Sequence, residues 1–247
     1  MARDAVPRPF LSARWTCLVM LNYEASPALL APLVPRGTEL DDWGGITYVS
    51  IVGLRFLDTR VMGVAVPLHR RFEEVNLRFY VRRRAGGEWR RGVVFIREIV
   101  RLRAVATVAR LAYNEPYVAL PMRHTVSFAD DAATEPARVE YEWRQGGAWN
   151  RLGARAGGAA MTAAEGSEAE FITEHYWGYT RRRDGGSIEY RVEHPRWRVW
   201  PAAESWLDAD VARLYGPSFA EVLAPPPRSA FLADGSAVRV MAPVGLL

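Results

Sequence analysis

The clearest structural signal in the chain is the stretch FEEVNLRFYVRRRAGGEWRRGVVFIREI, residues 72–99. From Val75 to Val81 the odd-numbered residues are apolar, which is the period-two pattern of a β-strand over 72–84. The tight-turn sequence AGGE follows, and residues 89–99 continue as a second strand. The stretch therefore predicts a β-hairpin.

Similar patterns recur along the rest of the chain. They predict further strands at residues 16–23, 46–56, 139–143, 149–154, 187–193, 196–200 and 229–233. Helix signals are fewer and predict helices at residues 28–33, 101–112, 167–173 and 206–215. The alternation within 101–112 also permits a continued strand, and the Gly/Ala-rich residues 156–166 indicate a loop. Many strands and few short helices indicate an α+β, mainly β fold, a curved or barrel-like sheet, in a single domain spanning residues 1–247.

The composition excludes one kind of chemistry. All 32 basic residues are arginine, and the chain contains no lysine. Arginine stays protonated at any working pH and is neither a nucleophile nor an imine former. Lysine Schiff-base catalysis and phosphate loops that require a lysine are therefore excluded. Because the net charge is only +4, nucleic-acid binding is not favoured.

Other global features bear on location. The longest stretch without a charged residue is 43–54, shorter than the roughly 20 apolar residues of a membrane span, so no membrane insertion is expected. Residues 1–7 hold no apolar signal segment, and the single Cys17 cannot form an internal disulfide. Both features favour a cytoplasmic protein, and self-association into a homo-oligomer is left open.

Several long segments carry a family resemblance: residues 10–40, 72–80, 92–122, 170–179 and 193–197. Together they resemble the YqjF-like family of uncharacterised bacterial proteins, over residues 8–235. That family is similar in turn to the acetoacetate decarboxylases. The elements that carry this remoter similarity are a strand and short helix ending in Val-Pro within 19–40, Phe72-Glu73-Glu74, and Arg97-Glu98-Ile99.

The resemblance implies a cone-like β-barrel, an antiparallel curved sheet around a small-molecule pocket. In the decarboxylases, the imine-forming lysine lies six residues after the glutamate of the last element, and Ala104 stands at that position here. The glutamate that assists the lysine would correspond to Glu74, and an arginine that binds the substrate carboxylate would fall near Arg14. The resemblance thus implies the scaffold, while Ala104 excludes the imine step.

On a strand, Glu74, Asn76 and Arg78 point to one face. If that face lines a barrel lumen, a carboxyl beside a guanidinium forms a polar pocket floor that can bind or protonate a carbonyl ligand. If it faces water, the three side chains are an ordinary solvated ladder. The pattern alone favours the solvated interpretation, whereas the resemblance favours the lumen for Glu74, which is the expected catalytic residue.

Further candidates for ligand binding come from two other places. Arg97 and Glu98 are neighbours, so they face opposite sides of a regular strand and only one of them can line a pocket. Arg97 is favoured for binding a carboxylate because its planar fork matches two oxygens, with a structural ion pair as the alternative. Tyr113 and Tyr117 are candidate ligand contacts, although buried tyrosines are commoner in cores.

No metal site is expected, because the histidines have no metal-ligand spacing: His69, His124, His175 and His194. His175 and His194 are interpreted as structural. The chain also lacks a nucleophile elbow and a dinucleotide glycine fingerprint, so no cofactor is expected.

The leading hypothesis is a pocket protein for a small organic acid or carbonyl compound, acting as a lyase, isomerase or hydratase without an imine. Whether the protein is an enzyme is left open. A non-catalytic ligand-binding or accessory protein is the first alternative. The second is an interaction protein that binds acidic partners through the arginine-rich hairpin tips at 82–84 and 181–183.

Overall fold

The computed structural model describes residues 9–65, 67–128 and 136–246. It contains the predicted hairpin as strands β5 (Phe72–Ala85) and β6 (Glu88–Val100). Both turn glycines have positive φ, 61° at Gly86 and 85° at Gly87. Positive φ at both central residues is the geometry of the hairpin turn that follows the twist of the strands.

The other predicted elements also form, with shifted ends. The remaining strands are β1 (Leu11–Glu24), β2 (Glu39–Leu40), β3 (Tyr48–Val61), β4 (Val64–Ala65), β7 (Tyr117–Ala119), β8 (Met122–Phe128), β9 (Pro136–Gln145), β10 (Ala148–Ala156), β11 (Met161–Thr162), β12 (Trp177–Arg181), β13 (Ser187–Glu193), β14 (Arg198–Asp208), β15 (Ser229–Val240) and β16 (Val244–Leu246). The helices are α1 (Pro27–Leu30) with a following 3-10 turn (Ala31–Leu33), α2 (Arg103–Ala112), α3 (Glu168–Thr173), α4 (Val211–Tyr215) and α5 (Pro217–Leu223).

Three predictions need correction. The helix expected at 206–215 is shorter, because Trp206 still pairs with Gly153 as the end of β14 and the helix begins only at Val211. The strand alternative for 101–112 is wrong, because this segment forms α2. The loop expected at 156–166 contains β11, which pairs with β14.

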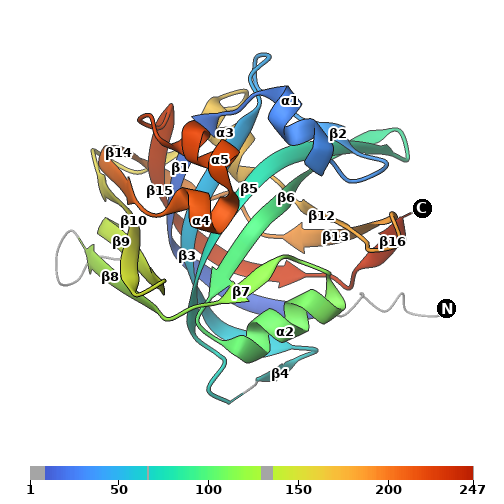
Figure 1. The fold of residues 1–247 in the computed structure, drawn as a ribbon, viewed down its shortest axis with the longest axis horizontal. Helices are drawn as coiled ribbons and strands as arrows, with labels where there is room; N and C mark the ends of the chain where they lie inside the picture. The colour runs from blue at the N-terminus through green and yellow to red at the C-terminus, as the bar shows by residue number, and fades with distance from the viewer. Residues whose placement is uncertain (1–8, 66, 129–135, 247) are drawn as a thin grey trace.

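A closed β-barrel is the centre of the fold. Among the described residues its seven strands follow one another in the order β13, β12, β6, β5, β3, β1 and β15, and β15 pairs with β13 to close the ring. Neighbouring strands are antiparallel except for β12 and β6, which run parallel. The mainly β, barrel-like fold expected from the sequence is confirmed, and the strands wrap around a common interior (Figure 1).

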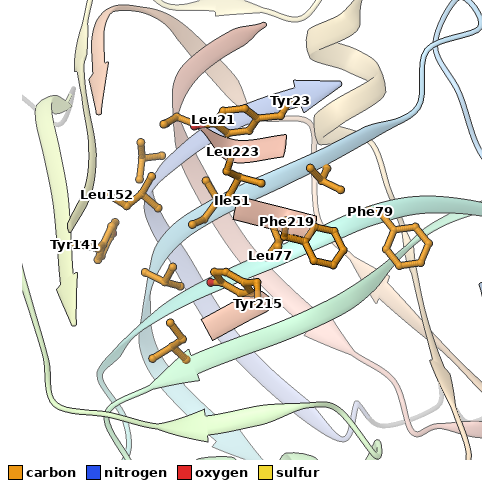
Figure 2. Close-up of a cluster of buried hydrophobic side chains, with 14 of the residues drawn as sticks. Leu21, Tyr23, Ile51, Leu77, Phe79, Tyr141, Leu152, Tyr215, Phe219 and Leu223 are labelled. Carbon is orange, nitrogen blue, oxygen red and sulfur yellow. The ribbon is translucent and has the colours of Figure 1, made fainter. Parts of the chain in front are cut away.

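A second layer covers one side of the barrel. Strand β14 pairs with β15 through residues 199–201 and then with β10 through residues 202–208. It thereby extends the sheet to β9 and β8. Helices α4 and α5 lie beside this extension, and side chains from both pack against the outer face of β1, β3 and β5 (Figure 2).

This layer decides which face of β5 is the interior. Val75, Leu77 and Phe79 have no exposed surface and pack beneath the second layer with Tyr141 and Phe219. The alternate residues of β5 therefore face the barrel lumen. The solvated interpretation of the polar face is wrong, because both faces of the strand are covered.

A glycine allows the second layer to approach closely. A Cβ at Gly53 on β3 would lie 2.3 Å from Cδ2 of the Tyr141 ring, and the Tyr141 hydroxyl donates to the Cys17 carbonyl at 2.7 Å. Gly53→Ala is therefore expected to lower the free energy of unfolding by about 1–3 kcal/mol, since the ring cannot move without losing that bond. Chemical denaturation measures the loss.

The double variant Gly53→Ala with Tyr141→Ala provides the control for this contact. It should be more stable than the sum of the two single losses predicts, because alanine lacks all the ring atoms that clash with the new Cβ. If the two losses of unfolding free energy simply add, residues 53 and 141 do not interact, and the close contact does not limit which residue position 53 can hold.

Candidate functional site

The barrel interior contains a cavity of about 200 Å³. Its apolar wall includes Trp15, Phe56, Phe95, Trp177 and Trp197. Its principal polar residues are Glu74, Asn76, Arg78, Glu98, Glu115 and Tyr117. A mostly apolar pocket with a few convergent polar groups is the common form of a small-molecule site.

Glu74 is held in place on the cavity wall by two hydrogen bonds. Asn76 Nδ2 donates to its Oε1 at 2.9 Å, and the Tyr117 hydroxyl donates to its Oε2 at 2.8 Å. The side chain is nearly inaccessible, with 3% of the residue exposed. Burial raises the pKa of Glu74 to about 7, against the lowering effect of these bonds and of the Arg78 charge.

A β-bulge determines which residue of the Arg97–Glu98 pair reaches the cavity. Leu77 on β5 pairs with Arg97, but the next residue, Arg78, pairs with Phe95, so Ile96 is an extra residue on β6. Without the bulge, Phe95 and Arg97 would share a face. The extra residue reverses the alternation and turns Glu98 inward instead.

The expectation that Arg97 binds the ligand is therefore corrected. Arg97 is not part of the cavity wall and lies near Tyr215 of α4, on the outer face of β6. Arg14 also lies outside the cavity. On β1 the neighbour Trp15 faces inward, so Arg14 points outward and is exposed, in a surface groove with Arg60.

Two further carboxyl groups face the cavity beside Glu74. Glu98 and Glu115 are 2% and 4% exposed. Burial, and then the negative charges of Glu115 and Glu74, raise the pKa of Glu98 well above its usual range. Burial also raises the pKa of Glu115 to about 7, and the Tyr190 hydroxyl donates to its Oε1 at 2.7 Å. Three carboxyls in one buried site cannot all ionise without strong repulsion, so the cluster retains protons near neutral pH.

Tyr113 and Tyr117, the two predicted ligand contacts, both line the cavity. Tyr117 hydrogen-bonds to Glu74, whereas the Tyr113 hydroxyl donates to the Met241 carbonyl at 3.1 Å. Tyr113 also packs edge-on against Tyr190 at 4.9 Å between ring centroids. Tyr117 thus belongs to the carboxyl cluster, and Tyr113 supports it.

The cavity wall also carries a buried arginine, Arg78. Arg78 Nη2 donates to the Ile172 carbonyl at 3.2 Å, while its buried Nε has no hydrogen-bond partner among the described residues. His175 lies nearby, between the rings of Tyr80 and Phe171 at 4.6 Å and 5.4 Å. Burial lowers the pKa of His175 well below its usual range, and the charges of Arg91 and Arg78 lower it further.

Ala104, which the resemblance places where the decarboxylases have their lysine, lines the cavity from α2. Its methyl group can neither attack a carbonyl nor accept a proton. Glu115 and Tyr190 line the cavity without being among the predicted site residues, and His175, which the sequence indicates as structural, lines it too. Only for Glu115 does the sequence contain a hint of a site, because this residue lies between Tyr113 and Tyr117 in a segment dense in hydrogen-bonding side chains.

Other possible sites receive less support from the structure. No cluster of three or more His, Cys, Asp or Glu side chains in residues 9–65, 67–128 and 136–246 is arranged to hold a metal ion. The arginines of the first hairpin tip already have partners in the protein. Arg82 bonds to Glu39 at 2.7 Å, Arg83 to Glu189 at 3.1 Å, and Arg84 lies over the Trp89 ring.

The sequence also matches a model of a known protein family over residues 12–237, described as an uncharacterized conserved protein. The chain belongs to the DUF2071 (YqjF-like) family. No curated protein shows significant sequence similarity to it. Among the residues that the structure describes, no helix is long and apolar enough to cross a bilayer.

Solved structures of acetoacetate decarboxylase-like proteins have a fold similar to that of this chain. The acetoacetate decarboxylase of Legionella pneumophila is 14% identical, with 100% of this chain and 93% of that chain covered and a TM-score of 0.66. An acetoacetate decarboxylase-like enzyme of Sphingomonas wittichii is 14% identical, covering 98% and 94%, with a TM-score of 0.65. The enduracididine biosynthesis enzyme MppR, solved with pyruvate, is 10% identical, covering 100% and 93%, with a TM-score of 0.68. These similarities establish the fold.

Proposed function

We propose that the cavity binds a small organic acid or carbonyl compound and that Glu74 exchanges a proton with it, without forming an imine. The observation that carries this proposal is the position of Glu74. Its carboxyl faces the cavity, is held by Asn76 and Tyr117, and has a pKa raised to about 7 by burial. A general acid–base is most effective when its pKa lies near the working pH.

The second part of the proposed site is Arg78, which binds the anionic group of the ligand. Arg78 follows Glu74 by four residues on the same face of β5, so their Cα atoms lie roughly 13 Å apart. Both residues line the cavity, and the Arg78 charge acts on the Glu74 carboxyl, whose pKa it lowers. A ligand that spans this space presents its carboxylate to Arg78 and its carbonyl region to Glu74.

The proposed chemistry is proton transfer next to a carbonyl group. Glu74 in its ionised form takes a proton from the adjacent carbon, and the neutral acid returns it to the same or a neighbouring atom. Lyase, isomerase and hydratase reactions share this step. The absence of lysine and the methyl group of Ala104 exclude a covalent imine with a side chain. The pyruvate complex of MppR supports the ligand class, since pyruvate is a carbonyl acid.

A ligand-binding protein without turnover is the alternative, and Ala104 favours it. A decarboxylase-like barrel whose lysine position holds alanine retains a pocket but lacks the nucleophile. Such a protein binds the same acids and carbonyl compounds and leaves them unchanged. Solvent-proton exchange into the bound ligand distinguishes the two functions.

Binding to Arg78 is tested with levulinate and pyruvate, two carbonyl acids. Arg78→Gln is expected to weaken binding by about 10- to 100-fold, because a charge-assisted hydrogen bond to a carboxylate is lost. Isothermal titration calorimetry gives the dissociation constants. Arg14→Gln is the matched control, since Arg14 is exposed and lies outside the cavity. Equal affinity in wild type and Arg78→Gln would remove Arg78 from the site.

A further inference from the structure

The acidic part of the cavity contains buried acceptor atoms that the protein does not satisfy. Glu98 Oε2, Glu115 Oε2 and Asn76 Oδ1 have no hydrogen-bond partner among the described residues. All of them belong to residues that line the cavity and are at most 4% exposed. Buried polar atoms are normally hydrogen-bonded, so unsatisfied ones next to a cavity indicate a ligand that supplies the missing groups.

The unsatisfied atom of Asn76 is an acceptor when Glu74 is ionised. Its amide nitrogen donates to Glu74 Oε1 at 2.9 Å, and a carboxylate oxygen can only accept that bond. The orientation of the amide is thereby fixed, with Oδ1 as the remaining atom. A neighbouring positive charge favours the ionised forms of Glu98 and Glu115 over the protonated ones, and in the ionised form their oxygens are acceptors only.

We propose that this part of the cavity binds a primary ammonium group, so that the ligand is an amino-bearing organic acid or carbonyl compound. A primary ammonium has three N–H donors and no acceptor, which matches Glu98 Oε2, Glu115 Oε2 and Asn76 Oδ1. Its positive charge also offsets the repulsion among the buried carboxyls. The inference rests on the proposed function, because it concerns the same cavity and narrows the class of its ligand.

Two other occupants fit these atoms less well. A metal ion requires several ligands converging at short distances, and the described residues form no such group. A proton shared between Glu98 and Glu115 satisfies two carboxyl oxygens but leaves Asn76 Oδ1 without a donor. The ammonium group satisfies all of them.

The basic part of the cavity completes the description of the ligand. Arg78 Nε and both ring nitrogens of His175 are buried without hydrogen-bond partners among the described residues. Asp41 Oδ2 lies 4.0 Å from His175 Nε2, which is too far for a hydrogen bond. Arg78 supplies the charged donor for a carboxylate, with His175 beside it. A ligand with an ammonium at one end and a carboxylate at the other therefore matches both the acidic side chains of the cavity and Arg78.

Calorimetric titration with ligands of similar length tests the inference. γ-Aminobutyrate and δ-aminovalerate carry both groups, levulinate and butyrate only the carboxylate, and n-butylamine only the ammonium. The amino acids are expected to bind at least about tenfold more tightly than levulinate. Glu98→Gln and Glu115→Gln, made separately, should each weaken amino-acid binding by about 10- to 100-fold and leave levulinate binding nearly unchanged.

The control variant is Glu204→Gln, which removes an exposed carboxylate paired with Arg155 at 2.7 Å. It should not change any affinity. Levulinate binding as tight as that of the amino acids, insensitive to Glu98→Gln and Glu115→Gln, would overturn the ammonium site and leave the proposed function standing. Binding of n-butylamine that depends on Glu98 but not on Arg78 would support the ammonium site and count against the proposed organic-acid function. Failure of every amino-bearing probe to bind would overturn the inference.

Discussion

Glu74→Gln is expected to slow solvent-deuterium exchange into bound levulinate or pyruvate by about 10²- to 10⁴-fold, which is the contribution of a well-placed general acid–base. Glutamine retains the carbonyl oxygen that accepts from Asn76, and its amide can donate to the Tyr117 hydroxyl. The geometry is thus preserved while the titratable proton is lost. Proton NMR in D₂O follows the signal of the carbon next to the ligand carbonyl.

Glu73→Gln is the matched control for this prediction. Glu73 precedes Glu74 on β5 but faces the other way and contacts His124 Nδ1 at 2.7 Å. Its removal should not affect the exchange rate. Equal exchange in wild type and Glu74→Gln would exclude Glu74 as the proton carrier. Exchange no faster than in buffer for the wild type would favour the non-catalytic alternative.

Glu115→Gln is expected to change how the stability of the protein depends on pH. Burial raises the pKa of Glu115 from 4.5 to about 7, so the folded protein holds this proton more tightly than the unfolded chain does. The stabilisation that results is fully present below about pH 4.5 and is lost as the pH rises through about 7. Over this window a single carboxyl contributes a change on the order of 3 kcal/mol.

Thermal unfolding of the two proteins from about pH 5 to about pH 8 measures this effect. Near pH 5 the wild type and Glu115→Gln should have similar stability, because glutamine resembles the protonated acid and still accepts from Tyr190. Near pH 8 the variant should be more stable than the wild type. Glu204→Gln, on the surface, should follow the wild-type profile closely. Parallel profiles for Glu115→Gln would show that Glu115 is ionised throughout.

The sequence predicted the barrel because its strands have local patterns. The alternation from Val75 to Val81 and the glycine turn at 86–87 are local signals, and both elements form as expected. The same alternation could not say which face of the strand is the interior. That depends on α4, α5 and the β8–β10 extension, which reach the outer face from distant parts of the chain.

The errors in the candidate site have equally physical causes. Nothing in the sequence around Ile96 indicates a bulge, since no glycine or proline interrupts the pattern there. The bulge is visible only in the pairing of β6 with β5. Because of it, Glu98 rather than Arg97 faces the cavity. Tyr190 and His175 join Glu115 and Arg78 through the closure of the barrel, which is a non-local event.

Infrared spectroscopy at about pH 6 tests most directly whether the cavity carboxyls are neutral acids, the property on which proton transfer by this site depends. Protonated carboxyls have a C=O stretching band separate from that of carboxylates. The wild type should show this band at a pH where exposed carboxyls have ionised, and the combined variant Glu74→Gln, Glu98→Gln and Glu115→Gln should lack it. A wild-type spectrum without the band would contradict the proposed site.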